Sequence, residues 1–158
     1  MRIYVPLLTA DVEALRHAAA GAGRLLLPSG RPTWAVTPAS RADRAGEDLE
    51  DLEYDALQDA VYAGLEHVED AARRSAPGTR RIGVAAGDVS DAAVAEASDT
   101  GGAFGVVMAR DEELRIASLH VTERGATAVR EDDTDPALLW FDVGELPTAL
   151  DYLAEPAA

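Results

Sequence analysis

The segment of residues 46–75 most constrains how this chain can fold. Apolar residues recur there at steps of three and four, which places them along one stripe of an α-helix, and carboxylates occupy the other face. Pro77 and Gly78 follow, and both favour the end of a helix. The pattern predicts a helix of about seven or eight turns with one buried side. The stripe consists of Leu49, Leu52, Ala56, Leu57, Ala60, Val61, Gly64, Leu65, Val68 and Ala72, and the opposite face carries Asp48, Asp51, Asp55, Asp59, Glu66 and Glu69.

The first half of the chain has the segment order of a split βαβ unit. Four short stretches rich in β-branched, aromatic or aliphatic residues favour strands. These stretches are residues 2–7, 25–27, 33–37 and 80–86. Residues 9–20 have a helical pattern with Thr9 as N-cap. Together with the long helix, this order predicts an α+β fold with a mainly antiparallel sheet, a ferredoxin-like βαββαβ first half, and the long amphipathic helix packed on it.

The second half is predicted to continue the same domain. Its segments are a helix at 90–97, strands at 103–109 and 114–122, a weak helix at 125–130, a strand at 138–143 and a helix at 144–153. The tetrapeptides Arg2-Ile3-Tyr4-Val5 and Arg81-Ile82-Gly83-Val84 are similar, so a chain of two related halves is an alternative. The length is usual for one domain. We therefore predict a single α+β domain over residues 1–154 and a frayed tail at 155–158.

The acidic charge of the chain limits its partners. The formal net charge is −15 over 158 residues. Such a surface repels phosphate backbones and anionic lipid heads, so nucleic-acid and membrane binding are disfavoured, whereas a basic protein partner would be attracted. No apolar run approaches the roughly 20 residues that span a bilayer, and the N-terminus lacks the pattern of a secretory signal peptide. Because cysteine is absent as well, we expect a soluble, cytoplasmic protein.

Several short motifs, in their order along the chain, carry a resemblance to a known family. They are Met1-Arg2-Ile3-Tyr4-Val5-Pro6, Ala35-Val36-Thr37-Pro38, Glu53-Tyr54 with Ala56-Leu57, Leu119-His120-Val121, and Leu139-Trp140-Phe141 followed by Glu145-Leu146-Pro147. On these motifs the chain resembles a family of small, uncharacterised actinobacterial proteins that is classed only as a domain of unknown function. The resemblance implies an actinobacterial, cytoplasmic origin, and it supplies no activity and no catalytic residues.

The motifs that hold cofactors or metals are missing from the sequence. Gly21 and Gly23 follow a predicted helix and precede a predicted strand, whereas phosphate-binding loops follow a strand and open a helix. His67 lies among carboxylates but has no second histidine one turn away. The acidic stretch at 131–135 lacks the glycine and the glutamate of a calcium loop, which leaves weak magnesium or calcium binding as an alternative to a solvated loop. We predict no cofactor and no metal.

His120 is the strongest candidate for acid–base chemistry. In an extended strand it would share one face with a serine, and on a covered or cleft-facing sheet it could transfer a proton. That face would carry Ile116, Ser118, His120 and Thr122. Glu50 and Glu53, three residues apart on the long helix, are the candidate carboxylate partners. A histidine that is only hydrogen-bonded within its strand is the alternative.

Aromatic and acidic residues are the candidates for a protein interface. Trp140 and Phe141 are adjacent, so on a strand one of them points away from the other and is either exposed or covered by a helix or a partner. Large aromatic side chains concentrate binding energy at interfaces. Asp51 and Asp55 lie on the acidic face of the predicted long helix, where a basic partner would meet them. A homodimer through an edge or a face of the sheet is a further alternative.

Two functions from different classes follow from these residues. The favoured one is a non-enzymatic protein-interaction or adaptor module with an acidic surface. The alternative is a small enzyme that uses His120 with the carboxylates of Glu50 and Glu53. An open pocket at His120 with a carboxylate within hydrogen-bond reach would favour the enzyme, because catalytic geometry has to be present before a pKa matters. A buried His120 would oppose it.

Overall fold

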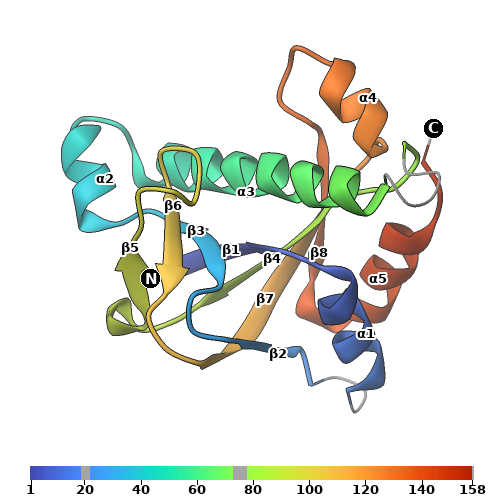
Figure 1. The fold of residues 1–158 in the computed structure, drawn as a ribbon, viewed down its shortest axis with the longest axis horizontal. Helices are drawn as coiled ribbons and strands as arrows, with labels where there is room; N and C mark the ends of the chain where they lie inside the picture. Colours follow the sequence, from blue (N-terminus) through green and yellow to red (C-terminus); the bar gives the residue numbers. More distant parts are fainter. Residues whose placement is uncertain (19–21, 73–77, 158) are drawn as a thin grey trace.

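One antiparallel sheet of eight strands forms the centre of the molecule in a computed structural model, which describes residues 1–18, 22–72 and 78–157 (Figure 1). The strands are β1 (Arg2–Pro6), β2 (Arg24–Leu27), β3 (Pro32–Ala35), β4 (Gly83–Asp88), β5 (Val94–Glu96), β6 (Gly105–Met108), β7 (Glu112–Thr122) and β8 (Leu138–Asp142). Their order in the sheet is β2-β7-β4-β1-β3-β6-β5, and β8 pairs with β7. The prediction of a single α+β domain with an antiparallel sheet is confirmed.

Helices cover both faces of this sheet (Figure 1). They are α1 (Thr9–His17), α2 (Pro38–Asp43), α3 (Leu49–Ala72), α4 (Ala126–Glu131) and α5 (Leu146–Ala154), with short 3₁₀ turns η1 (Asp91–Ala93) and η2 (Val143–Glu145). The side that packs on α3 and α4 is here called the α3 face, and its strand residues include Tyr4, Trp34 and Val84. The opposite side packs on α1 and α5 and is called the α5 face, with Ile3 and Leu119 among its residues.

Helix α3 lies against the sheet along a stripe of small and aliphatic residues. Ala56, Ala60 and Val61 are fully buried there. The close approach continues at Gly64, where an added Cβ would lie 2.6 Å from Cγ2 of Ile82 and 3.3 Å from Cβ of Pro6. The absent side chain thus lets the helix backbone lie directly on β1 and on the residues that lead into β4. The expected end of this helix at Pro77 lies outside the described residues.

The sheet does not have the ferredoxin-like order, because β2 lies elsewhere. Strands β4, β1 and β3 are antiparallel neighbours, as that fold requires. In the ferredoxin-like order β2 would pair with β3, but β3 pairs with β6, and β2 pairs with the first half of β7. Leu25 and Leu27 of β2 are thereby buried on the α5 face, in one cluster with Leu114. Burial of these leucines against β7 therefore replaces the predicted contact with β3.

A β-bulge shifts the side-chain alternation along β7. Ala86 of β4 lies opposite Ser118, but Gly87 lies opposite Ile116, so one extra residue is inserted in β7 between them. Ile116 consequently belongs to the cluster on the α5 face, while Ser118 pairs with a residue of the α3 face. The predicted alignment of Ile116 with Ser118 and His120 is therefore wrong. A strict alternation does not anticipate an inserted residue.

One further segment differs from the prediction, and the difference follows from a tertiary contact. The predicted helix at 90–97 is instead the turn η1 followed by β5, since Val94 and Ala95 pair with β6. The tail beyond residue 154 keeps contacts with the domain through residue 157. Ala157 is buried, and its N–H donates to the carbonyl of Thr79 at 2.8 Å.

Candidate functional site

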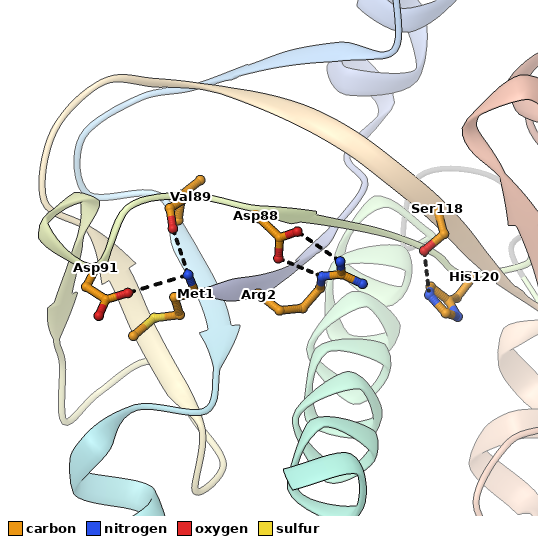
Figure 2. A network of polar contacts seen from close by, with 7 residues as sticks. All are labelled: Met1, Arg2, Asp88, Val89, Asp91, Ser118 and His120. Atoms are coloured by element: carbon orange, nitrogen blue, oxygen red, sulfur yellow. Dashed lines mark hydrogen bonds and ion pairs between the residues drawn. The ribbon is translucent and has the colours of Figure 1, made fainter.

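The candidate site is the part of the α3 face formed by β7 and β8, together with the adjoining ends of β1 and β4. Cross-strand pairing brings the residues together, because directly paired residues point to the same side of a sheet. Val84 lies opposite His120, and His120 lies opposite Trp140. In the neighbouring row Ala86 lies opposite Ser118. Helix α3 packs on β1, β3 and β4, and the site lies beside it (Figure 2).

A bidentate ion pair closes one end of the site. Arg2 and Asp88 are cross-strand partners on β1 and β4. Nε and Nη2 of Arg2 each donate to a carboxylate oxygen of Asp88 at 2.9 Å (Figure 2). These hydrogen bonds lower the pKa of Asp88 below its usual value. Nearby, the amino group of Met1 donates to the carbonyl of Val89 at 2.8 Å. The strand end is thereby held in one arrangement.

His120 is a neutral, mostly enclosed side chain. Its Nε2 lies 3.1 Å from Oγ of Ser118 (Figure 2), and its ring meets the ring of Tyr4 edge to face at 6.5 Å. Burial, and to a lesser degree the positive charge of Arg2, lowers the pKa of His120 to about 4. Burial, with the charge of Glu53, raises the pKa of Tyr4 to about 12. At neutral pH both rings are therefore uncharged.

The two candidate catalytic carboxylates do not complete an acid–base site. In the described part of the chain the hydrogen-bond partner of His120 is Ser118, and neither Glu50 nor Glu53 bonds to the imidazole. Glu50 is exposed on the first turn of α3, and Glu53 is half-buried and influences Tyr4 and Arg2 through its charge. A general base works best with a pKa near the working pH. His120, with a pKa of about 4, does not meet that condition near neutrality.

Trp140 and Phe141 point to opposite faces of β8. Phe141 packs against the cluster of the α5 face and lies 5.9 Å from the ring of Tyr152 on α5. Trp140, on the α3 face, keeps 60% of its surface exposed. In the described part of the chain β8 pairs with β7 and with no further strand, so Trp140 has a neighbouring strand on one side. Of the two adjacent aromatics, Trp140 is therefore the one that a partner can reach.

The acidic candidates on α3 have different environments. Asp51 is exposed. Asp55 is half-buried and forms an ion pair with Nη1 of Arg44 at 2.7 Å. Asp59, one turn further on, accepts a hydrogen bond from the N–H of Phe104 at 3.3 Å. Asp55 and Asp59 thus hold neighbouring segments of this chain, and Asp51 is the one of the three that is turned to solvent.

Sequence reasoning missed a group of tyrosines and carboxylates beside β8. The hydroxyl of Tyr54 donates to Oδ2 of Asp135 at 3.4 Å, and Tyr54 and Tyr62 are 48% and 41% exposed. Partial burial, together with Asp135, raises the pKa of both phenols. The spacing of the tyrosines places them on one side of α3, which is a signal that the sequence contains. Their proximity to Asp135 depends on the loop before β8 and has no sequence signal.

A cavity of about 390 Å³ lies away from this site, on the α5 face. It is lined mainly by apolar residues of α1, η2 and α5, among them Leu15, Val143 and Leu150. Its cationic side chain, Arg16, is already bound to the carboxylate of Asp151 and the carbonyl of Leu150. His120 is not among the residues that line the cavity.

In the ranges 1–18, 22–72 and 78–157 no helix is long and apolar enough to cross a membrane. Over the same ranges, no group of three or more histidine, cysteine, aspartate or glutamate residues is placed to hold a metal ion.

Comparison with known proteins places the chain in a family and gives no activity. A family model matches residues 1–150, and it is described as a family of unknown function, DUF6912. No curated protein and no solved structure matches the chain.

Proposed function

We propose that this chain, which belongs to that family of unknown function, is a non-enzymatic protein-interaction module that binds a basic protein through its acidic surface. The observation that carries the proposal is the exposure of Trp140 on the strand β8. A tryptophan that is 60% exposed on a folded strand is unusual, because covering its large apolar ring lowers the free energy. Such side chains are frequent among the residues that dominate binding energy at interfaces.

Carboxylates around β8 indicate the charge of the partner. Asp133 and Asp135 precede the strand, and Asp142 and Glu145 follow its exposed tryptophan; all four are exposed. The chain as a whole carries a formal net charge of −15. A partner with lysine or arginine next to an apolar or aromatic contact would complement both features, and its approach would be accelerated by the long-range attraction.

The enzyme is the less supported function. His120 is hydrogen-bonded to Ser118, carries a pKa of about 4 and lacks a bonded carboxylate among the described residues. These properties favour a histidine that stabilises the strand over one that transfers protons. The alternative would regain support if a substitution of His120 abolished a measured activity without changing the fold.

The proposed function is tested by affinity capture with matched variants. Tagged native protein is incubated with lysate of its own source organism at low and high salt, and bound proteins are identified by mass spectrometry. We expect a basic protein that is retained by the native chain and lost from Trp140→Ala. A triple variant at the site, Asp133→Asn with Asp135→Asn and Asp142→Asn, should lose it at low salt.

A second triple variant controls for net charge. Glu13→Gln with Asp43→Asn and Asp99→Asn removes the same charge from exposed positions on other elements. It should retain the partner, because surface charges separated by more than about 10 Å are screened at 0.1 M salt. Equal capture by native protein and both Trp140→Ala and the site variant would contradict the proposal.

A further inference from the structure

We infer that the basic partner binds as an additional β-strand on the free edge of β8, through an extended segment in which basic and apolar residues alternate. This inference rests on the proposed function and specifies its binding mode. Three observations carry it: the direction of the backbone groups of β8, the composition of that edge, and the charges at its two ends.

The backbone groups of Trp140 point away from the sheet. In an antiparallel pair, residues alternate between pairs that exchange backbone hydrogen bonds and pairs whose N–H and C=O point outward. Thr122 lies opposite Leu138, and the N–H of Glu123 donates to the carbonyl of Ala137 at 3.0 Å, which makes 123 and 137 a bonded pair. Bonded pairs recur at every second residue, so the next ones along β8 are those of residues 139 and 141. Trp140 belongs to the outward-pointing set.

The end of the strand supports the same assignment. Asp142 shares the alternation of Trp140, and its N–H donates to the carboxylate of Glu145 at 3.1 Å and not to β7. The Glu145 side chain thus satisfies the last outward N–H of the edge. Within the described part of the chain, β8 pairs with β7 and with no other strand, so the N–H and C=O of Trp140 form the centre of an open edge.

The edge of β8 lacks the features that usually prevent strand addition. Natural sheets protect their edges with very short strands, charged side chains, prolines or bulges. At one end of this sheet β5 has three residues, one of them Glu96. Strand β2 begins with the charged residue Arg24, whose guanidinium forms an ion pair with the carboxylate of Glu113. In contrast, β8 reads Leu-Leu-Trp-Phe-Asp, so four apolar residues precede its one charge. An edge of this kind is suited to a partner strand.

The surrounding charge selects a basic segment over a second copy of the chain. Two copies joined edge to edge at β8 would bring Asp135 and Asp142 of both chains together, and each chain carries a formal charge of −15. Like charges at that distance oppose association, while lysine or arginine would be attracted to the same carboxylates. Charge complementarity therefore points to a different protein with a basic extended segment.

The side chains on the two faces of β8 indicate which residue types alternate along the partner segment. On the α3 face, side chains of the added strand would lie beside the exposed ring of Trp140 and the carboxylate of Asp142, which suits basic residues, since a cation over an indole ring is attracted to it. On the α5 face they would lie beside Leu139 and Phe141, which suits apolar residues. Residues i and i+2 of the segment are therefore basic, and those between them are apolar.

The test uses the full chain and three fluorescein-labelled peptides of seven residues. The first is Val-Lys-Val-Lys-Val-Lys-Val, the second has glutamate in place of lysine, and the third keeps the lysines but has proline at the third and fifth positions. Binding is measured by fluorescence anisotropy to native protein, Trp140→Ala and Trp140→Pro. Both variants lose the ring, but only proline removes the outward N–H, and an edge strand tolerates proline. Circular dichroism checks that both variants fold.

Strand addition predicts a specific order of affinities. The valine–lysine peptide should bind native protein at least tenfold more tightly than the glutamate peptide or the proline peptide does. It should bind Trp140→Pro at least tenfold more weakly than Trp140→Ala. Hydrogen exchange measured by NMR should show the Trp140 amide becoming protected when the first peptide is added.

Other outcomes separate the binding mode from the proposed function. Equal binding of both lysine peptides, with equal effects of the two Trp140 variants, would overturn strand addition and leave a basic partner in place. No preference of any lysine peptide over the glutamate peptide would overturn both. Dimerisation of the native chain by light scattering, abolished by Trp140→Pro, would show that a second copy occupies the edge and would overturn the basic segment.

Discussion

His120 and Trp140 are direct partners across the β7–β8 pair, yet their side chains have opposite environments. Trp140 is 60% exposed, whereas His120 is enclosed enough that its pKa falls to about 4. His120 has β4 on its other side and Tyr4 and Ser118 beside it. Trp140 has β7 on one side, and among the described residues no strand lies on the other. This pair therefore marks the boundary between the covered and the open part of the α3 face.

The low pKa of His120 predicts that the protein loses stability as the pH falls. An unfolded histidine has a pKa near 6.5 and the folded one about 4, so below pH 6.5 the unfolded state binds more protons. The free energy of unfolding that depends on an uncharged His120 is fully present above pH 6.5 and is lost as the pH falls toward 4. One pKa unit corresponds to about 1.36 kcal/mol, which sets the maximum loss at about 3 kcal/mol. Urea unfolding at pH 7.5, 6, 5 and 4.5 measures it.

The variant His120→Gln isolates this contribution. Asp59 has a pKa raised by burial, so its titration contributes to the pH dependence with the opposite sign. Subtracting the unfolding free energies of His120→Gln from those of the native chain removes every group except His120. A difference that stays constant between pH 7.5 and 4.5 would mean that His120 is accessible to protons in the folded state. An NMR titration of the imidazole would then give a midpoint near 6.5.

The direction of the β8 backbone predicts a pattern of hydrogen exchange in the free protein. The amides of Leu139 and Phe141 face β7 and should exchange slowly, while the amide of Trp140 points to solvent and should exchange fast. We expect protection factors of Leu139 and Phe141 to exceed that of Trp140 by about 100-fold or more, because opening of the sheet is needed for the first two. A two-dimensional NMR exchange series measures all three. Slow exchange at Trp140 in the free protein would show that its edge is already covered.

The sequence predicted the class of the fold better than its connectivity. Apolar periodicity is local, so the antiparallel sheet and the α+β class follow from it, and they are confirmed. The partner of a strand is not a local property: the apolar pattern of Leu25 and Leu27 predicts a buried face but does not say which strand lies beside it. The ferredoxin-like order failed for that reason.

The candidate site shows the same limit. Strand alternation anticipates that Trp140 and Phe141 face opposite sides, but not which of them is covered, since that depends on where α5 packs. The position of Ile116 was mispredicted because a single inserted residue beside Gly87 reverses the alternation. The pairing of Tyr54 with Asp135 joins segments 81 residues apart, and a pattern within either segment does not contain it.

Close packing at Gly64 predicts that a single methyl group destabilises the fold. An added Cβ would lie 2.6 Å from Cγ2 of Ile82, so Gly64→Ala requires α3 or Ile82 to move. Overpacking of this kind costs about 1–3 kcal/mol, and at a 2.6 Å approach to the stiff, β-branched Ile82 we expect the cost to lie above the gain of about 1 kcal/mol from replacing glycine by alanine within a helix. Chemical unfolding should show a net loss in Gly64→Ala. In the background Ile82→Ala, Cγ2 is gone and only Cβ of Pro6 at 3.3 Å remains, so the same substitution should cost clearly less, and a loss of equal size there would refute the contact with Ile82.

The buried ion pair of Asp11 and Arg31 predicts a strongly non-additive pair of substitutions. Nη2 of Arg31 donates to Oδ2 of Asp11 at 2.6 Å and to the carbonyl of Pro6 at 3.0 Å, and both side chains are largely buried. Asp11 also accepts the N–H of Leu8 at 2.7 Å at the start of α1. Asp11→Ala leaves a buried guanidinium without its counter-ion and should cost about 3–5 kcal/mol. Arg31→Met in that background removes the unpaired charge and should recover more than half of the loss.

The exposed pair of Arg24 and Glu113 is the control, since Glu113→Ala should cost less than about 1 kcal/mol. Urea unfolding of the four proteins of the cycle gives the coupling energy. Additive effects of Asp11→Ala and Arg31→Met would mean that α1 is held in place by its apolar contacts at Leu15 and not by this ion pair.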